Sequence, residues 1–297
     1  MFKQGKWAKL MISVVIIASL VLILPVSVAY AHVQLPPPPP PPGPLGTAAD
    51  FAVLGASTVT NTGLTVVNGG HVGVSPGSAI TGFFPPGVVN SPGTIHLNDA
   101  AAQQAHTDAQ TAYNNLAAAT VTQDLTGQDL GNVSTLANPL TPGVYHFNTS
   151  AQLTGTLYLD AQSNPNSVFI FQIGSTLTTA SGSSVIVINA PANWCSKYWQ
   201  IGVSATLGTS TAFVGTIIAN VSITMNTSAS LYGRAMALTG AVTLDTNTIT
   251  VPVCSINAPP APTPELPAGI LLSFGLVGMG SYCVIRSKNQ KRKSGSY

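Results

Sequence analysis

This 297-residue chain contains few charged residues, since Asp, Glu, Lys and Arg together make up 6% of it. Eight of the ten basic residues lie near the two ends, so residues 45–258 contain Lys197 and Arg234 against seven aspartates and no glutamate. Such an acidic segment repels a phosphate backbone, which excludes nucleic acid as a partner. The scattered aspartates also argue against the paired carboxylates of a glycosidase and against a calcium site.

Motifs for catalysis are equally scarce. "GVSPG" at 73–77 fits G-x-S-x-G, but a proline follows Ser75 and no strand-to-helix elbow is in sight, so the stretch is typical of a turn. His71, His96, His106 and His146 lack the spacing of metal ligands. The sequence therefore predicts no enzyme, with no catalytic residue, metal site, cofactor or small-molecule substrate.

Cysteine is rare as well, with three in the chain, and Cys283 lies within an apolar segment near the C-terminus. Outside the cell, Cys195 and Cys254 are candidates for a disulfide that closes a long loop and stabilises the domain by about 3 to 5 kcal/mol. The alternative is two unpaired buried thiols. The distance between the two residues decides between them.

Long apolar runs occur only at the ends. Residues 1–31 combine three lysines, an apolar run and a final Ala-Tyr-Ala, which predicts a secretory signal peptide, with an uncleaved membrane anchor as the alternative. Residues 268–285 are apolar over about a bilayer's width and precede the basic tail 286–297, which should stay cytoplasmic. We expect a protein that is secreted and held at the cell surface by this C-terminal membrane helix.

Two proline-rich stretches, 32–46 and 257–267, cannot pack into a core and act as spacers. They leave one folded domain at 47–256, facing outward. Within it a single segment has helical period, after Asn98 as a plausible N-cap. Its apolar stripe consists of Ala101, Ala105, Ala109, Ala112, Tyr113 and Leu116. This predicts a helix of about 20 residues that lies close against a flat surface.

The rest of the domain has strand composition and repeats itself. Segments 205–219, 223–237 and 242–251 align at offsets of 18 and 19 residues. The aligned columns are Thr206, Thr224 and Thr243; Leu207, Met225 and Leu244; Thr209, Thr227 and Thr246; and Phe213 with Leu231. A fourth copy at 175–187 places Thr176, Leu177 and Thr179 in the same columns. A period near 20 predicts stacked coils, a β-solenoid with Leu207 and its equivalents inside and the adjacent threonines outside.

Columns of threonine on such a surface form a rank of methyls and hydroxyls about 4.7 to 4.9 Å apart. Threonine is stiff at χ1, and without charges nearby its methyls and hydroxyls can order water into an ice-like layer. The alternative is that threonine is simply a good strand residue on a solvated face.

Several stretches resemble the DUF3494-type ice-binding proteins of bacteria and fungi. They include "LGTAADFAVLGASTVTNTG" (45–63), "LTPGVYHF" (140–147), "SVFIFQIGSTLTTASGS" (167–183) and "WQIGVSATLGTSTAFVGTIIA" (199–219). The resemblance covers the whole domain. It implies an all-β fold with one long α-helix: a right-handed, discontinuous β-solenoid of triangular cross-section with the helix alongside. "PELPAG" (264–269) and the segments after it resemble PEP-CTERM-like sorting tails.

In the family, ice is bound by a flat face rich in Thr, Ser and Ala, sometimes with Thr-Ala/Gly-x-Thr/Asn motifs. Four stretches here match the first position of that motif and none the last: 179–182, 209–212, 227–230 and 246–249. Together with the repeat columns they nominate the ice-binding candidates Thr176, Thr179, Ser181, Thr206, Thr209, Thr211, Thr224, Thr227, Thr243, Thr246 and Thr248.

The function predicted is non-enzymatic binding of ice or ordered water, by which the protein limits ice growth or recrystallisation or holds the cell at an ice surface. The alternative is a surface adhesin or matrix-binding domain, for which Trp194, Tyr198 and Trp199 could form a sugar-stacking platform. The same aromatics could instead plug the core. Arg234 is expected to bind a loop carbonyl or an aspartate rather than a substrate.

Overall fold

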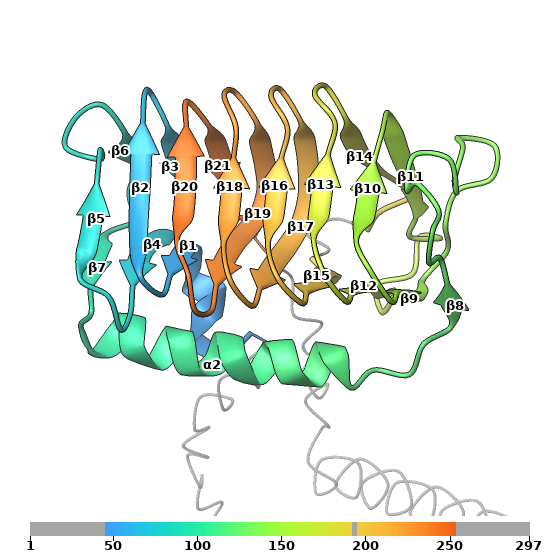
Figure 1. Ribbon diagram of the computed structural model, residues 1–297, viewed down its shortest axis with the longest axis horizontal. Helices are drawn as coiled ribbons and strands as arrows, with labels where there is room; N and C mark the ends of the chain where they lie inside the picture. Colours follow the sequence, from blue (N-terminus) through green and yellow to red (C-terminus); the bar gives the residue numbers. More distant parts are fainter. Residues whose placement is uncertain (1–44, 192–194, 254–297) are drawn as a thin grey trace, which may run out of the picture. The chain divides into compact units, whose positions relative to one another are not determined.

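The computed structural model describes residues 45–191 and 195–253, in which short parallel strands wind into stacked coils above one long helix (Figure 1). The strands belong to a seven-stranded and a 14-stranded sheet. Parallel pairing and the burial of alternate residues agree with the predicted β-solenoid.

The seven-stranded sheet forms the front of the molecule in Figure 1. Its strands in spatial order are β10 (Ala151–Leu153), β13 (Leu177–Thr179), β16 (Ala205–Leu207), β18 (Ile223–Met225), β20 (Val242–Asp245), β2 (Thr58–Thr62) and β5 (Ala79–Thr81). The order is discontinuous, since β2, from the start of the domain, lies beside β20, from its end. The N-terminal coils therefore stack directly on the C-terminal coils, although the two lie far apart in the sequence.

The 14-stranded sheet bends into two further faces. The rear face contains β11 (Thr156–Asp160), β14 (Ser184–Ile188), β21 (Thr248–Thr250), β3 (Val66–Asn68), β6 (Val88–Val89) and the first halves of β17 (Ala212–Ala219) and β19 (Ser230–Ala237). Gly215 and Gly233 pair in register at the bend, and a Cβ on Gly233 would lie 2.0 Å from the Gly215 carbonyl oxygen. Glycine is required there because the backbones approach so closely.

The second halves of β17 and β19 belong to the helix face. The other strands of this face are β8 (Gln123–Asp124), β9 (Gly143–Phe147), β12 (Phe169–Ile173), β15 (Lys197–Ile201), β1 (Phe51–Gly55), β4 (His71–Val74) and β7 (Ile95–Leu97). Helix α2 (Ala100–Ala117) covers it, with the short 3-10 helix η1 (Gly46–Asp50) beside it. Three sides result, as the family resemblance implied.

Helix α2 has 18 residues, and Asp99 rather than Asn98 is its N-cap, accepting the Ala102 N–H at 2.9 Å. Its buried stripe is Ala102, Ala105, Ala109, Ala112 and Leu116. The prediction was therefore wrong for Ala101, which is exposed. Small side chains let the helix lie against Ile218 and Met236 of the helix face.

The core is filled by residues from all three faces. Trp199 is fully buried and stacks on Phe171 with ring centroids 4.0 Å apart, and Tyr145 stacks on the far side of Phe171. Tyr198 is buried as well, against the helix side. Burial of Tyr198 and Trp199 confirms that they belong to the core rather than to a surface platform, and Trp194 lies outside the described residues.

Register among the coils agrees with the sequence alignment in three coils and differs in the fourth. Thr206 pairs with Thr224 and Thr224 with Thr243, and Phe213 pairs with Leu231, as predicted. In β13, however, Thr178 rather than Thr176 lies opposite Thr206. The alignment of this copy was wrong by two residues, a shift that keeps the same side chains inside and is therefore invisible to an inside-outside pattern.

Candidate functional site

A single column of threonines crosses the outer surface of the seven-stranded sheet, one from each of six consecutive coils. In spatial order the column is Thr81, Thr60, Thr243, Thr224, Thr206 and Thr178, each in register with the next. Gln152 of β10 continues it at one end. We call this surface the threonine face.

Five of the six threonines, all but Thr81, are flanked on both sides by buried residues, so the alternation of the strand turns them outward. In β18, for example, Ile223 and Met225 are buried while Thr224 between them is partly exposed. Three members of the column are exposed and three half-buried, and the hydroxyls of Thr60 and Thr243 lie 3.4 Å apart. Their spacing follows the separation of neighbouring strands, about 4.8 Å, and χ1 stiffness keeps each side chain in place.

A second column of small residues runs parallel to the first, two positions earlier in each coil. Its members are Ala79, Thr58, Ala241, Ser222, Ser204, Thr176 and Ser150. Hydroxyls here bond across coils, as between Ser150 Oγ and Thr176 Oγ1 at 2.8 Å. No side chain larger than threonine stands in this column, so the threonine face stays low and even beside its central column.

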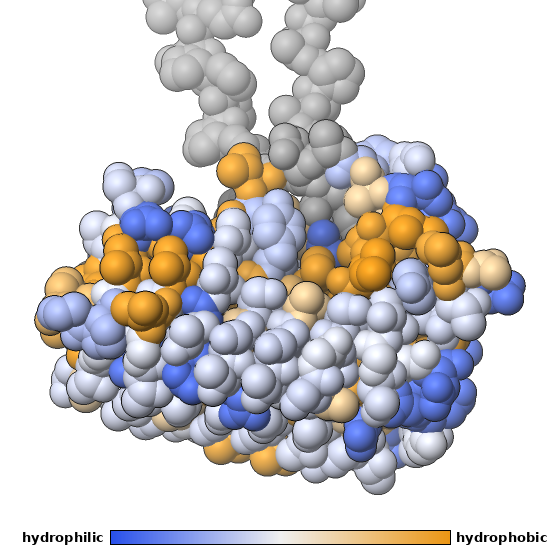
Figure 2. Space-filling view, turned by 90° about the horizontal axis from the view of Figure 1, so that it is seen from above, coloured by the Kyte–Doolittle hydropathy of each residue, from blue (hydrophilic) through white to orange (hydrophobic). Residues whose placement is uncertain are grey.

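Charge is nearly missing from the threonine face. Its seven strands, all of them described, contain Asp245 as their one ionisable residue. Figure 2 views the molecule from above and shows the turns at the edge of this face, where mostly near-neutral side chains form a broad band between hydrophobic patches. A surface of this kind holds water through hydroxyls rather than through strong ionic shells.

Nine of the eleven predicted site residues lie in four places on the surface. Thr206, Thr224 and Thr243 stand in the central column, and Thr176 stands in the second column. Ser181, Thr209, Thr227 and Thr246 lie on the turns that lead from the threonine face to the rear face. Thr248 is exposed but belongs to the rear face.

Two predicted residues are not available to a ligand. Thr179 and Thr211 are buried, and their hydroxyls bond to each other at 2.8 Å. Thr179 also accepts the Gly208 N–H at 2.8 Å. The motif match was wrong at these two positions because both side chains turn inward and bond beneath the turn.

Three members of the central column, Thr60, Thr81 and Thr178, were missed. The alternation "TVTNT" at 58–62 is a strand signal that could have nominated Thr60. Its place beside Thr243, 183 residues away, depends on a pairing between the two ends of the domain. For Thr178 the signal was present in "TLTT", but the register chosen was the other one allowed by the same alternation.

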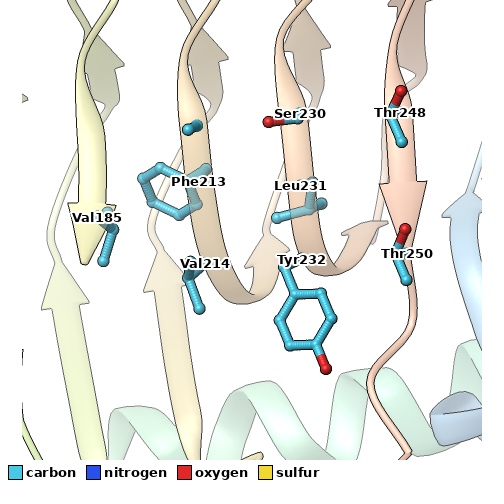
Figure 3. Close-up of a pocket in the computed structure, with 9 residues that line it drawn as sticks. Val185, Phe213, Val214, Ser230, Leu231, Tyr232, Thr248 and Thr250 are labelled. Atoms are coloured by element: carbon cyan, nitrogen blue, oxygen red, sulfur yellow. The ribbon is translucent and has the colours of Figure 1, made fainter. Parts of the chain in front are cut away.

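The rear face is different in character. Val214 and Tyr232 lie side by side on this face, and Thr250 lies next to Tyr232. They help to line a shallow hollow of about 190 Å³ (Figure 3). Tyr232 is 48% exposed and Ile186 of β14 is 41% exposed. Bulky, uneven and partly aromatic side chains make this face a poor template for a regular lattice of water.

The two cations of the domain lie away from the threonine face. Arg234 is buried, and its Nε donates to the Ala49 carbonyl oxygen at 2.8 Å, so it binds a backbone carbonyl as expected, here of η1 rather than of a loop. Lys197 is also buried, and desolvation lowers its pKa from 10.5 to about 8. Neither residue can clamp an anionic ligand on the surface.

The remaining candidate catalytic or metal-binding residues make hydrogen bonds that stabilise the fold. Ser75 is buried and its hydroxyl donates to Asn98 Oδ1 at 3.1 Å, as fits a turn. His96 bonds to Asp99 at 2.8 Å, and its other ring nitrogen lies 3.3 Å from Nδ1 of His71. Burial, followed by the nearby His96, lowers the pKa of His71. These two histidines link β4 and β7 to the N-cap of α2.

Cys195 is disulfide-bonded, and its sulfur lies 4.0 Å from the Pro252 carbonyl oxygen. The predicted partner, Cys254, lies outside the described residues, so the pairing stays a prediction. Residues 45–191 and 195–253 contain no helix that is both long and apolar enough for a bilayer. The predicted signal segment 1–31 and membrane helix 268–285 also fall outside them.

Comparison with known proteins finds one family and several close structural likenesses. The family model described as Ice-binding-like matches residues 53–250. An ice-binding protein of Nostoc sp. (strain HG1) is 50% identical over 237 residues, 79% of this chain and 84% of that protein.

Two crystal structures have the same fold. An ice-binding protein from an Antarctic biological consortium is 44% identical with a TM-score of 0.64, covering 70% of this chain and 90% of that one. The ice-binding protein of the Antarctic ascomycete Antarctomyces psychrotrophicus is 36% identical with a TM-score of 0.60, covering 70% and 97%.

Proposed function

Because the chain belongs to the ice-binding-like family, we propose that it binds ice, without catalysis, through the threonine face. The observation that carries the choice of face is the unbroken column of six threonines in register on neighbouring strands. Adsorption to ice requires a surface whose groups repeat at fixed intervals, and stacked coils supply that repeat.

The physical action is ordering of water. Threonine methyls cannot hydrogen-bond, so water beside them arranges itself into cages, while the hydroxyls attach those cages to the protein. The second column of Ala, Ser and Thr leaves room for water between the ranks. Molecules adsorbed in this way limit growth or recrystallisation of the crystal, or hold a cell at its surface.

The other two sides are less suited to the task. The helix face is covered by α2. The rear face carries the exposed rings and branched chains around Tyr232 (Figure 3). The adhesin alternative loses its main support, since Trp199 and Tyr198 are buried in the core.

We place the domain outside the cell. The disulfide at Cys195 supports this location, because disulfides persist in oxidising compartments. The lysine-led apolar segment 1–31 supports secretion, and the apolar segment 268–285 with its basic tail supports a membrane tether. The PEP-CTERM-like tail would then direct processing of that anchor.

Thr224→Tyr tests the function and the face together. A ring in the middle of the column would stand above the neighbouring threonines and hold the face away from ice, so recrystallisation inhibition should weaken by about tenfold or more. Thr248→Tyr is the matched control, because it places the same ring on the rear face.

Both variants should keep the wild-type circular dichroism spectrum and melting temperature. Equal loss of activity in the two variants, or loss only in Thr248→Tyr, would move the binding surface away from the threonine face. Absence of thermal hysteresis and of recrystallisation inhibition in the folded wild-type domain would overturn the function itself.

A further inference from the structure

In five neighbouring coils, the turn between the threonine face and the rear face contains a residue of left-handed backbone. These residues are Gly63, Thr246, Ser228, Ser210 and Gly182, with φ of 91°, 54°, 61°, 58° and 73°. All of them except Gly63 donate their N–H to a carbonyl of the next coil, as Thr246 does to Thr62 at 3.1 Å and Ser228 to Asp245 at 3.2 Å. They therefore form a column along the rim of the threonine face.

Thr246 has the least favourable backbone conformation among the residues of this rim. A β-branched residue in left-handed backbone is strained, and the equivalent positions hold glycine or serine. Its hydroxyl also needs space, because a Cβ on Gly63 in the next coil would lie 2.2 Å from it. Persistent strain of this kind at a surface is a reason to look for a functional role.

Asp245 is what holds the Thr246 hydroxyl. Its Oδ1 accepts from Thr246 Oγ1 at 3.0 Å, and its Oδ2 accepts from Thr227 Oγ1 of the neighbouring coil at 2.5 Å. An ionised carboxylate can only accept, so both threonines donate their hydroxyl protons to it. Each oxygen keeps its lone pairs as an acceptor, on exposed Thr227 and half-buried Thr246, and the donated bonds fix both hydroxyl orientations.

Further hydrogen bonds hold the backbone that carries the Asp245 side chain. The Asp245 N–H donates to Oδ1 of Asn247 at 2.7 Å. Asn247 is buried, and its amide donates to the carbonyl oxygens of Asn226 and Ala229 at 2.9 and 3.0 Å. The network therefore ties the β18 and β20 coils together directly below the rim.

The electrostatic surroundings of Asp245 are simple. Its pKa is lowered by the hydroxyl of Thr227 first and that of Thr246 next; desolvation opposes this, and the hydroxyl of Thr62 adds the smallest lowering. Within the described residues, β2, β18 and the turns packed against it present no other ionisable group that shifts it. Asp245 is thus ionised throughout the neutral range.

We propose that Asp245 is a positioning residue of the ice-binding surface, which orients the hydroxyls of Thr227 and Thr246 so that the rim accepts hydrogen bonds from ordered water in one fixed arrangement. This inference rests on the proposed function. It also explains why the one charge on the threonine face is tolerated, since its oxygens are engaged by protein hydroxyls.

Asp245→Asn tests the role. The amide keeps the size and one acceptor oxygen, but its NH2 group cannot accept, so one threonine hydroxyl loses its partner and rotates. Recrystallisation inhibition should weaken by about fivefold to tenfold. Asp124→Asn is the matched control, since Asp124 also accepts a threonine hydroxyl, that of Thr126 at 2.6 Å, but lies on β8 of the helix face.

A pH profile separates positioning from a merely structural role. Wild type and Asp124→Asn should lose activity as the pH falls through the lowered pKa of Asp245, whereas Asp245→Asn should be equally weak at every pH at which it stays folded. Unchanged or stronger inhibition by Asp245→Asn, or the same pH profile as wild type, would overturn the proposal. If Thr224→Tyr is still inactive in that case, ice binding by the threonine face stands without it.

Discussion

At the scale of the residue, threonine serves twice in this molecule, and neighbouring residues decide in which role. Thr224 between buried Ile223 and Met225 must point outward, because strand residues alternate. Thr179 occupies an inward position and satisfies its hydroxyl on Thr211. Composition alone could not separate the two roles, but strand parity could.

Gly63 provides a prediction at this scale. Gly63→Ala must accept a left-handed φ of 91° and also displace the Thr246 hydroxyl, so we expect the free energy of unfolding to fall by about 2 to 3 kcal/mol. Gly155→Ala is the matched control, with φ of 80° and no atom within 4 Å of the added Cβ.

Denaturant unfolding of both variants gives the comparison, and the control should lose only about 1 kcal/mol. Similar losses in the two would mean that the Thr246 hydroxyl moves aside freely.

At the scale of the element, close packing against the sheet restricts the size of the side chains on α2. Its stripe is alanine because the helix lies directly on a sheet, and Ala109 is fully buried. The helix thereby leaves the threonine face free while closing the core.

Ala109→Leu should overpack this contact and lower the free energy of unfolding by about 1 to 3 kcal/mol in a denaturant titration. Ala101→Leu, on the exposed side of the same helix, should change it by a few tenths of a kcal/mol only, since both residues are good helix formers. Recrystallisation inhibition per folded molecule should stay constant in both. Loss of activity in a folded Ala109→Leu variant would implicate the helix face in binding.

At the scale of the whole molecule, scarcity of charge shapes stability as well as function. Lys197 is buried with a pKa of about 8, below its ordinary 10.5. Below pH 8 the folded and unfolded states both carry the proton, and the desolvation cost is fully present. As the pH rises from 8 towards 10.5 the unfolded state binds more protons than the folded one, so stability increases.

We therefore expect the free energy of unfolding to be about 1 to 2 kcal/mol greater at pH 9.5 than at pH 7.5. The raised pKa of Tyr145 and of Tyr198 keeps these buried phenols neutral in that range. Lys197→Met should show no such rise. A rise of equal size in the variant would assign the pH dependence to other groups.

The sequence by itself determined the coil repeat, the inward and outward parity of Thr206, Thr224 and Thr243, and the alanine stripe of the helix. These features depend on period, and each coil carries its own copy of that information. The length of the threonine column depended on tertiary structure, because Thr60 and Thr81 join it through pairing of β2 with β20.

Tertiary structure also decided the register of β13 and the burial of Thr179 and Thr211. Alternation is unchanged by a shift of two residues, so only the contacts between coils could select one register. Only the packed molecule could likewise tell which of the three sides is covered, since that depends on where α2 lies.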